Sequence, residues 1–266
     1  MTACVSIFEY NDYLCTKYCF NDIVMIGVIL AAGMAKRLRP LTDECPKCLL
    51  KVGKRTLLQR TVDAVVAAGI DELVVVTGYR NNMIVDFLTS HYPSLTIHFI
   101  DNPDYAHNNN IFSLWLTRPY TEGKDFLLLD SDILFDPAII LAITGPAETV
   151  LALNRHELGE EEIKVIADHE GYVKEISKVC SIQEAIGESV GIEKMTAAYS
   201  QALFCELQHM IVDEGLIDVF YEKAFERLIA QGHTFKVVDT TNCFSIELDT
   251  VEDFENAKKL IPANLY

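Results

Sequence analysis

The stretch of sequence that decides the fold is IGVILAAGMAKRLRPLT, at residues 26–42. Residues 26–30 form a short apolar run of the kind that is typical of a buried strand. The run passes directly into a loop of small residues, where backbone N–H groups can approach an anion closely. Ligands of open α/β sheets bind at the carboxyl ends of the strands, which is where this loop falls. The stretch therefore predicts a first strand followed by an anion-binding loop.

This loop also concentrates positive charge, because Lys36, Arg37 and Arg39 lie together in a chain that is poor in bases. It matches neither the P-loop pattern nor the G-x-G-x-x-G pattern. A strand-to-helix turn with a solvated basic tip is the simpler interpretation. We predict that the loop holds a nucleoside triphosphate, with the nucleotide-binding residues Leu30, Ala31, Ala32, Gly33, Met34 and Ala35.

Strands and helices alternate after this stretch. Further apolar runs lie at 72–77, 95–100 and 125–129, and helical patterns lie at 56–68, 81–91 and 110–117. Near-continuous apolar strands that alternate with amphipathic helices are typical of a parallel sheet covered on both faces. The predicted fold class is therefore α/β, a Rossmann-like mixed, mostly parallel sheet with helices on both faces.

Residues 148–194 predict an inserted β-rich region. Its strands are expected near 149–153, 163–167, 172–177 and 190–194. The chain then continues with helices near 196–212 and 218–231, a strand pair near 234–247 and a last helix at 250–260. No repeat, low-complexity tract or linker interrupts residues 25–266, so one domain is expected there.

Residues 1–24 differ from the rest, since their cysteines and aromatic residues show no clear period. Met25 then opens the clean strand pattern of residues 26–30. Two interpretations stay open for residues 1–24: an N-terminal extension that packs on the domain or on a partner, or a mis-called leader that ends before a true start at Met25. We prefer the second.

The composition limits the classes of function. The chain has 266 residues, of which 50% are apolar, so it can bury a sizeable core. Its net charge of −17 makes it a poor candidate for binding nucleic acid, although a metal ion and a few bases can still hold a phosphate ligand. No apolar run reaches the roughly 18 residues of a membrane span. Eight irregularly spaced cysteines, with Cys45-x-x-Cys48 as an isolated pair, indicate reduced thiols in a cytoplasmic protein.

Lys47 lies between Pro46 and apolar residues, ten positions after Arg37 in the same long loop region, so both bases could converge on one site. The pattern L-A-A-G-M-A-x-R-L-x-P-L-T, followed by P-K-x-L-L, resembles the sugar-phosphate and choline-phosphate nucleotidyltransferases over residues 25–260. The resemblance implies that Arg37 and Lys47 are catalytic residues that bind the triphosphate, with Lys47 at the α-phosphate. Many family members have a glycine where this chain has Ala35, which is a mild departure.

Two acidic segments are candidates for a metal site. The segment DSD at residues 130–132 follows a predicted strand, and carboxylates there suit Mg²⁺, although Asp and Ser also favour plain turns. By resemblance, Asp132 is the first metal ligand, with Asp130 in support, and Asp249 is the second. Thr250 also looks like the N-cap of the last helix, and both roles can hold, because a cap places Asp249 just before the helix.

The segment NNIFSLW at residues 109–115 resembles the bacterial choline-phosphate cytidylyltransferase branch, as do residues 162–165 and 187–194. The preference for CTP rests on this resemblance. The residues predicted to meet the nucleotide base are Gly78, Tyr79, Asn109 and Asn110.

The acceptor site is predicted from residue types. Lys164 and Lys194 are candidates for binding the acceptor's phosphate, and Trp115 could offer an aromatic face to a quaternary ammonium. Further aromatic residues lie beside carboxylates in the later half, where an acceptor site and an ordinary core both fit: Tyr199, Phe220 and Tyr221, beside Asp218 and Glu222.

The resemblance thus implies transfer of a cytidylyl group from CTP to a small phosphorylated acceptor, foremost phosphocholine, with release of pyrophosphate. The alternatives in the same class are sugar-1-phosphate, inositol-phosphate and 2-aminoethylphosphonate nucleotidyltransferases. A non-catalytic nucleotide-binding sensor is the alternative of a different class, and the intact set of Arg37, Lys47, Asp132 and Asp249 argues against it. Mg²⁺ is the expected cofactor, nucleic acid and membranes are not expected partners, and the oligomeric state stays open.

A chain that starts at Met25 tests the leader interpretation. It should fold and keep its activity, because the first strand and the anion-binding loop begin there. The measurements are circular dichroism, gel filtration and turnover beside the full chain. Loss of solubility or of an oligomer in the shortened chain would favour a genuine extension.

Overall fold

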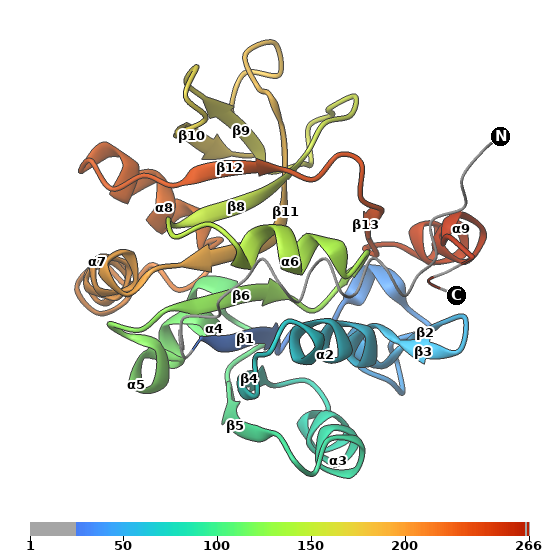
Figure 1. Cartoon of the computed structure of the whole chain (residues 1–266). Coiled ribbons are helices and arrows are strands. Elements are labelled where there is room, and N and C mark those ends of the chain that lie inside the picture. Colours follow the sequence, from blue (N-terminus) through green and yellow to red (C-terminus); the bar gives the residue numbers. More distant parts are fainter. Residues whose placement is uncertain (1–24, 264, 266) are drawn as a thin grey trace, which may run out of the picture.

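The computed structural model describes residues 25–263 and 265, and its centre is a nine-stranded mixed sheet (Figure 1). Residues 1–24, the predicted extension or leader, lie outside the described residues. The strand order is β10-β9-β11-β6-β1-β4-β5, and β8 pairs with both β11 and β12. The strands are β1 (Ile26–Ala31), β4 (Glu72–Thr77), β5 (Thr96–Asp101), β6 (Phe126–Asp130), β8 (Val150–Asn154), β9 (Lys164–Ala167), β10 (Val173–Ser177), β11 (Gly187–Met195) and β12 (Lys236–Asp239).

The parallel half of the sheet is built around β1. This strand pairs in parallel with β4 on one side and with β6 on the other, and β4 pairs in parallel with β5. Successive side chains of a strand point to opposite faces. Val28 therefore joins the core on one face, while Ile29 joins the core on the other, and both are fully buried. The carboxyl ends of β1 and β6 consequently meet at one edge.

Helices cover both faces, which confirms the predicted fold class. One core cluster packs α4, α7 and α8 on the sheet, and a second packs α2, α3 and α6 on the opposite face. A third cluster, around Phe254, packs α9 near the short hairpin of β2 (Lys51–Val52) and β3 (Arg55–Thr56). The helices are α2 (Leu57–Ala67), α3 (Asn81–His91), α4 (Asn110–Leu116), α5 (Arg118–Thr121), α6 (Ala138–Thr144), α7 (Ala197–Gln208), α8 (Glu222–Ala230) and α9 (Val251–Leu260). In the part of the chain that the structure describes, no helix is both long and apolar enough to cross a membrane.

The β-rich region extends the same sheet. Strand β11 pairs antiparallel with β6, β8 and β9, and β9 pairs antiparallel with β10. Strand β11 covers nine residues rather than the five predicted near 190–194, because it has partners along its whole length. The inserted strands therefore form the upper part of one continuous sheet in Figure 1.

Two strands lie within 234–247 as predicted, but they do not pair with each other. Strand β12 pairs in parallel with β8, whereas β13 (Ser245–Glu247) pairs antiparallel with β7 (Ile133–Phe135). The two strands therefore find hydrogen-bond partners in different parts of the molecule, and the segment between them carries the chain from one part to the other. Strand β7 and helix α6 were not predicted.

Two helix boundaries also differ from the prediction. The helix expected over 196–212 ends as α7 at Gln208 and continues as a π-helical turn, His209–Asp213. The helix expected over 218–231 begins later, at Glu222. This shorter α8 leaves residues 218–221 in a connection, and this connection reaches the site described below.

Candidate active site

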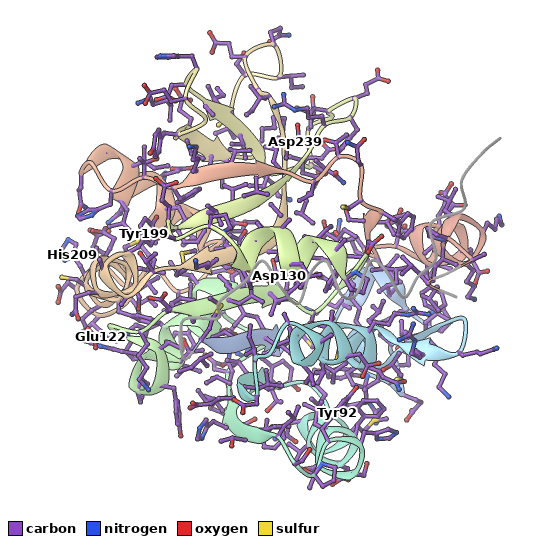
Figure 2. The ribbon with its side chains drawn as sticks, in the orientation of Figure 1. Tyr92, Glu122, Asp130, Tyr199, His209 and Asp239 are labelled. Carbon is purple, nitrogen blue, oxygen red and sulfur yellow. The ribbon has the colours of Figure 1, made fainter. Side chains whose placement is uncertain are left out.

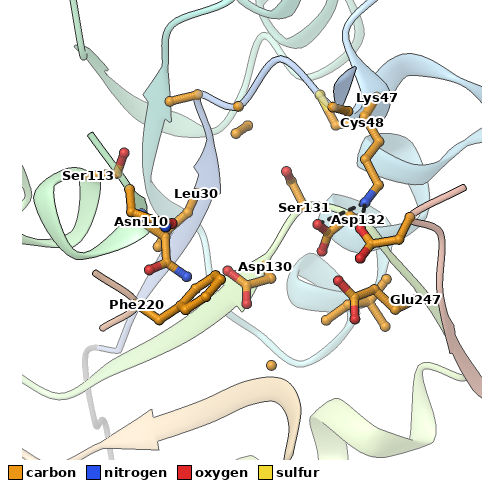
Figure 3. A pocket seen from close by; sticks show the side chains of 18 of the residues that line it. Leu30, Lys47, Cys48, Asn110, Ser113, Asp130, Ser131, Asp132, Phe220 and Glu247 are labelled. Carbon is orange, nitrogen blue, oxygen red and sulfur yellow. Dashed lines mark hydrogen bonds and ion pairs between the residues drawn. The ribbon is translucent and has the colours of Figure 1, made fainter. Parts of the chain in front are cut away.

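A cavity of about 650 Å³ opens beside the carboxyl ends of β1 and β6 (Figure 3). Several connections contribute to it: the loop after β1, the turn after β6, the segment before α9 and two single-turn helices. These short helices are η1 (Lys36–Leu38) and η2 (Lys47–Leu49). The cavity therefore lies at the edge of the sheet where the sequence predicted a ligand.

An ion cluster crosses one side of the cavity. Lys47 is 8% exposed, and its Nζ donates to Asp132 Oδ2 at 3.0 Å and to Asp249 Oδ1 at 2.8 Å. Arg37 donates to the other oxygen of Asp249. The structure thus brings together the two basic residues predicted to be catalytic, Arg37 and Lys47, and the two predicted metal ligands.

Local pairing explains why Asp132 and Asp249 meet. Asp132 lies in the turn between β6 and β7, and Asp249 lies between β13 and α9. The β7–β13 pair aligns the two segments, and the Leu248 N–H donates to the Asp132 carbonyl at 3.1 Å. The predicted N-cap is confirmed: Thr250 and Asp253 form a capping box, which begins α9 immediately after Asp249.

Opposing effects set the charge states in this cluster. Burial lowers the pKa of Lys47, but the carboxylates of Asp132 and Asp249 more than compensate, so this pKa lies above its ordinary value. Burial raises the pKa of Asp249, yet Lys47 and Arg37 together hold it below its ordinary value. Each of these two carboxylates therefore has a basic partner within hydrogen-bond distance.

A third carboxylate joins the two that the sequence predicted. Asp132, Glu247 and Asp249 each offer one oxygen, and these oxygens all lie within 4.8 Å of one another. Burial, together with repulsion by Asp132 and Asp249, raises the pKa of Glu247 to about 8. The sequence analysis assigned no metal role to Glu247, although side chains two positions apart in an extended segment, such as Glu247 and Asp249, lie on the same side. This set of oxygen donors fits a hard divalent cation.

The loop after β1 has the conformation that an anion-binding loop needs. Ala35 adopts a left-handed conformation with φ 46°, and its carbonyl accepts from Thr42 Oγ1 at 2.9 Å. A side chain at Gly33 would meet nothing within 4 Å, so the backbone there is open. Of the predicted nucleotide-binding residues in this loop, all but Met34 line the cavity: Leu30, Ala31, Ala32, Gly33 and Ala35.

The residues predicted to meet the nucleotide base divide into two groups. Asn109 and Asn110, at the start of α4, line the cavity. Gly78 and Tyr79 are not among its lining residues. A Cβ at Gly78 would lie 2.8 Å from the Ala32 carbonyl, so this glycine permits close packing under the loop. The Tyr79 hydroxyl lies 2.8 Å from the Thr42 carbonyl and braces the loop from outside.

None of the three predicted acceptor residues is brought to the cavity. Lys164 is 1% exposed, and its Nζ donates to the backbone carbonyls of Glu160, Glu162 and Lys178. Lys194 is also 1% exposed and donates to the Pro146 carbonyl. Trp115 packs against the core, and its Nε1 donates to Gln208 at 3.2 Å. The structure therefore does not support an acceptor role for them.

The wall away from Lys47 is formed by residues from the connection before α8. Phe220 and Glu222 line the cavity there, and Figure 3 shows Phe220 across the cavity from Lys47. Asp130, near the middle of the molecule in Figure 2, lines the cavity at the end of β6. Tyr199 and Tyr221 are instead buried core residues. Of the later aromatic candidates, only Phe220 therefore reaches the cavity.

The chain is similar to known proteins over all or part of its length. Residues 26–149 match the family described as Nucleotidyl transferase. The chain is 26% identical over 241 residues to the CMP-5'-(3-aminopropyl)phosphonate synthase of Streptomyces rubellomurinus, a match that covers 87% of this chain and 38% of that protein. It is 33% identical over 108 residues to a choline-phosphate cytidylyltransferase of Streptococcus pneumoniae, covering 41% of this chain and 44% of that protein. The chain thus matches less than half the length of each of these relatives.

A solved structure shares the fold. The CTP:phosphocholine cytidylyltransferase from Streptococcus pneumoniae superposes with a TM-score of 0.74 at 19% identity, and the match covers 90% of this chain and all of that one. At this identity the likeness supports the architecture alone. It confirms the predicted α/β class with its mixed, mostly parallel sheet.

Removing any one of the three clustered carboxylates should weaken metal binding. Asp132→Asn, Glu247→Gln and Asp249→Asn should each lower the affinity for Mn²⁺, a paramagnetic probe, by at least about tenfold, because even outer-shell partners of a metal contribute that much. Electron paramagnetic resonance titration measures the affinity. Asp43→Asn, an exposed aspartate paired with Arg39, is the matched control. Unchanged affinity in all three variants would rule out the site.

Proposed function

Because residues 26–149 belong to the nucleotidyl transferase family, we propose that this chain transfers a cytidylyl group from CTP to a small phosphorylated acceptor. The products are the CDP-linked acceptor and pyrophosphate. The observation that carries the proposal is the convergence of Arg37, Lys47, Asp132 and Asp249 in one cavity. CTP as the donor is supported by relatives whose names refer to CMP or cytidylyl products.

The reaction needs no covalent intermediate with the protein. An oxygen of the acceptor's phosphate forms a bond to the α-phosphorus of CTP, while the bond from this phosphorus to the bridging oxygen breaks. The electron pair of the broken bond leaves with pyrophosphate. The acceptor phosphate is already an anion, so no general base is required. Catalysis then consists of positioning and electrostatic stabilisation.

Three parts of the cavity supply this stabilisation. Lys47 stabilises the charge that builds on the α-phosphate, since its amine is ionised and borders the cavity. Arg37 and the N–H groups of the open loop around Gly33 hold the β- and γ-phosphates. These bases are concentrated locally in a chain of net charge −17.

We propose Mg²⁺ as the cofactor. Asp132, Glu247 and Asp249 would hold it, because their oxygens cluster within 4.8 Å and Mg²⁺ prefers oxygen ligands. When bound, the ion supplies neutralisation of the charge on the nucleotide's phosphates. A cytoplasmic location remains a prediction from the sequence.

The acceptor is proposed to carry a cationic head group, and phosphocholine is the acceptor that the choline-phosphate relative suggests. The wall away from Lys47 presents the carboxyl groups of Asp130 and Glu222 beside the Phe220 ring. A sugar's hydroxyls could donate hydrogen bonds to these carboxyl groups, but a sugar would bring no positive charge to this wall.

Lys47→Ala should lower kcat by about 10²–10³, the scale seen when one such electrostatic group is removed. CTP binding should weaken less, and Mn²⁺ binding should not weaken, because Lys47 competes for the carboxylates rather than serving as a ligand. Steady-state pyrophosphate release and Mn²⁺ titration measure kcat and metal affinity, with Lys51→Ala, at the exposed residue of β2 (Lys51–Val52), as the control. A variant with near-normal kcat would exclude this role for Lys47.

A panel of acceptors tests the proposed reaction. With CTP and Mg²⁺, phosphocholine or an aminoalkyl phosphate should give a higher kcat/KM than glucose-1-phosphate or inositol phosphate. Trp115→Leu should leave the ranking unchanged, because Trp115 lies outside the cavity lining. If only sugar-1-phosphates are turned over, the proposal of a cationic acceptor is wrong and the acceptor is a sugar phosphate. Nucleotide binding without any pyrophosphate release would favour the sensor.

A further inference from the structure

Two buried glutamates beside the cavity have hydrogen-bonding capacity that the protein does not use. Glu222 lines the cavity, is 6% exposed, and its Oε2 has no hydrogen-bond partner among the described residues. Glu193, on β11, is 1% exposed, and its Oε2 also lacks a partner in that part of the chain. Buried polar atoms are nearly always hydrogen-bonded, so such atoms at the wall of a cavity indicate a missing donor.

The neighbouring donors are directed elsewhere. Ser189 Oγ donates to the other oxygen of Glu193 at 3.2 Å, and the Tyr221 hydroxyl donates to Asp130 at 3.0 Å. Lys178 is a cation on the cavity wall near Glu222. Its Nζ lies 3.4 Å from Glu161 and 5.0 Å from the centre of the Phe220 ring. Within residues 25–263 and 265, Glu222 Oε2 therefore has no donor.

Burial makes this arrangement costly in an empty cavity. Burial and the neighbouring Glu222 carboxyl raise the pKa of Glu193 to about 8, and burial raises the pKa of Glu222 to about 7. A ligand that brings both a positive charge and N–H donors would stabilise the ionised form and satisfy the open oxygen.

We propose that Glu222 is the specificity-determining residue for the acceptor's head group and selects a primary ammonium over a trimethylammonium. This inference rests on the proposed cytidylyl transfer and narrows its acceptor to an aminoalkyl phosphate or phosphonate. A primary ammonium donates N–H bonds to Glu222 Oε2, the open acceptor at the cavity wall. Glu193 is a second buried carboxyl that interacts with Glu222 but does not line the cavity.

A trimethylammonium lacks what this wall requires. It carries no N–H, so Glu222 Oε2 would stay without a donor, and such a group is held chiefly by aromatic faces. Among the described lining residues, the aromatic ones are Tyr105 and Phe220. The Lys178 ammonium already lies over the Phe220 ring. The cavity therefore offers carboxylate oxygens rather than an aromatic cage.

The test compares three acceptors of matched length: 2-aminoethyl phosphate, phosphocholine and propyl phosphate. Pyrophosphate release with CTP and Mg²⁺ gives kcat and KM for each. In the unaltered protein, kcat/KM for 2-aminoethyl phosphate should exceed the values for the other two by at least about tenfold, the scale of one hydrogen bond to a charged group. This ranking alone tests the proposal without any variant.

Glu222→Gln should lower kcat/KM for 2-aminoethyl phosphate by about tenfold to a hundredfold, mainly through KM. The value for propyl phosphate and the affinity for CTP should stay unchanged, which separates a specificity role from a structural one. Glu226→Gln, on the same helix but outside the cavity lining, is the matched control. An equal loss for both acceptors, or phosphocholine turnover as efficient as that of 2-aminoethyl phosphate, would overturn the proposal.

Failure of the proposed reaction would be distinguishable. If no acceptor releases pyrophosphate from CTP, cytidylyl transfer is excluded for these acceptors. Calorimetric titration of 2-aminoethyl phosphate and of phosphocholine into the CTP-loaded protein then decides the head-group preference on its own. Tighter binding of 2-aminoethyl phosphate that is lost in Glu222→Gln would support the subsite, and equal binding of the two would overturn it.

Discussion

The site depends on one buried contact, the Lys47 ammonium that bridges Asp132 and Asp249 at 3.0 and 2.8 Å. The two carboxylates come from connections far apart in the chain, and like charges this close would repel without a cation between them. The segment before α9 therefore docks on the sheet edge through the same amine that borders the cavity. The β7–β13 pair and this ion cluster together hold the two carboxylates beside the cavity.

The two walls of the cavity differ in charge. On one side, Lys47 and Arg37 neutralise carboxylates and leave a site suited to phosphates and a divalent cation. On the other, Glu222 is buried, and none of the residues that the structure describes donates to its Oε2. Lys164 contributes to this structure, because its Nζ donates to the backbone carbonyls of residues 160, 162 and 178. Two residues of these segments, Glu161 and Lys178, line the cavity. A buried lysine thus organises the rim without binding a ligand there.

Prediction from sequence succeeded where the signal was local. The apolar run at 26–30, the small-residue loop and the cap at Thr250 each depend on neighbouring residues, and the structure has all three. The predicted strand pair near 234–247 failed because each strand found a distant partner. Lys164 and Lys194 were misassigned because residue type does not reveal whether an amine faces a cavity or backbone carbonyls.

The sequence by itself determined the α/β architecture and the four charged residues of the ion cluster, because strand periodicity and motif spacing are written in short segments. The tertiary structure alone decided which further residues share the cavity. Glu247 joins Asp132 through the β7–β13 pair, and Glu222 reaches the wall because α8 begins only there. Such positions depend on long-range packing and on burial, which set the hydrogen-bond partners and the pKa of each group, and no local pattern carries that information.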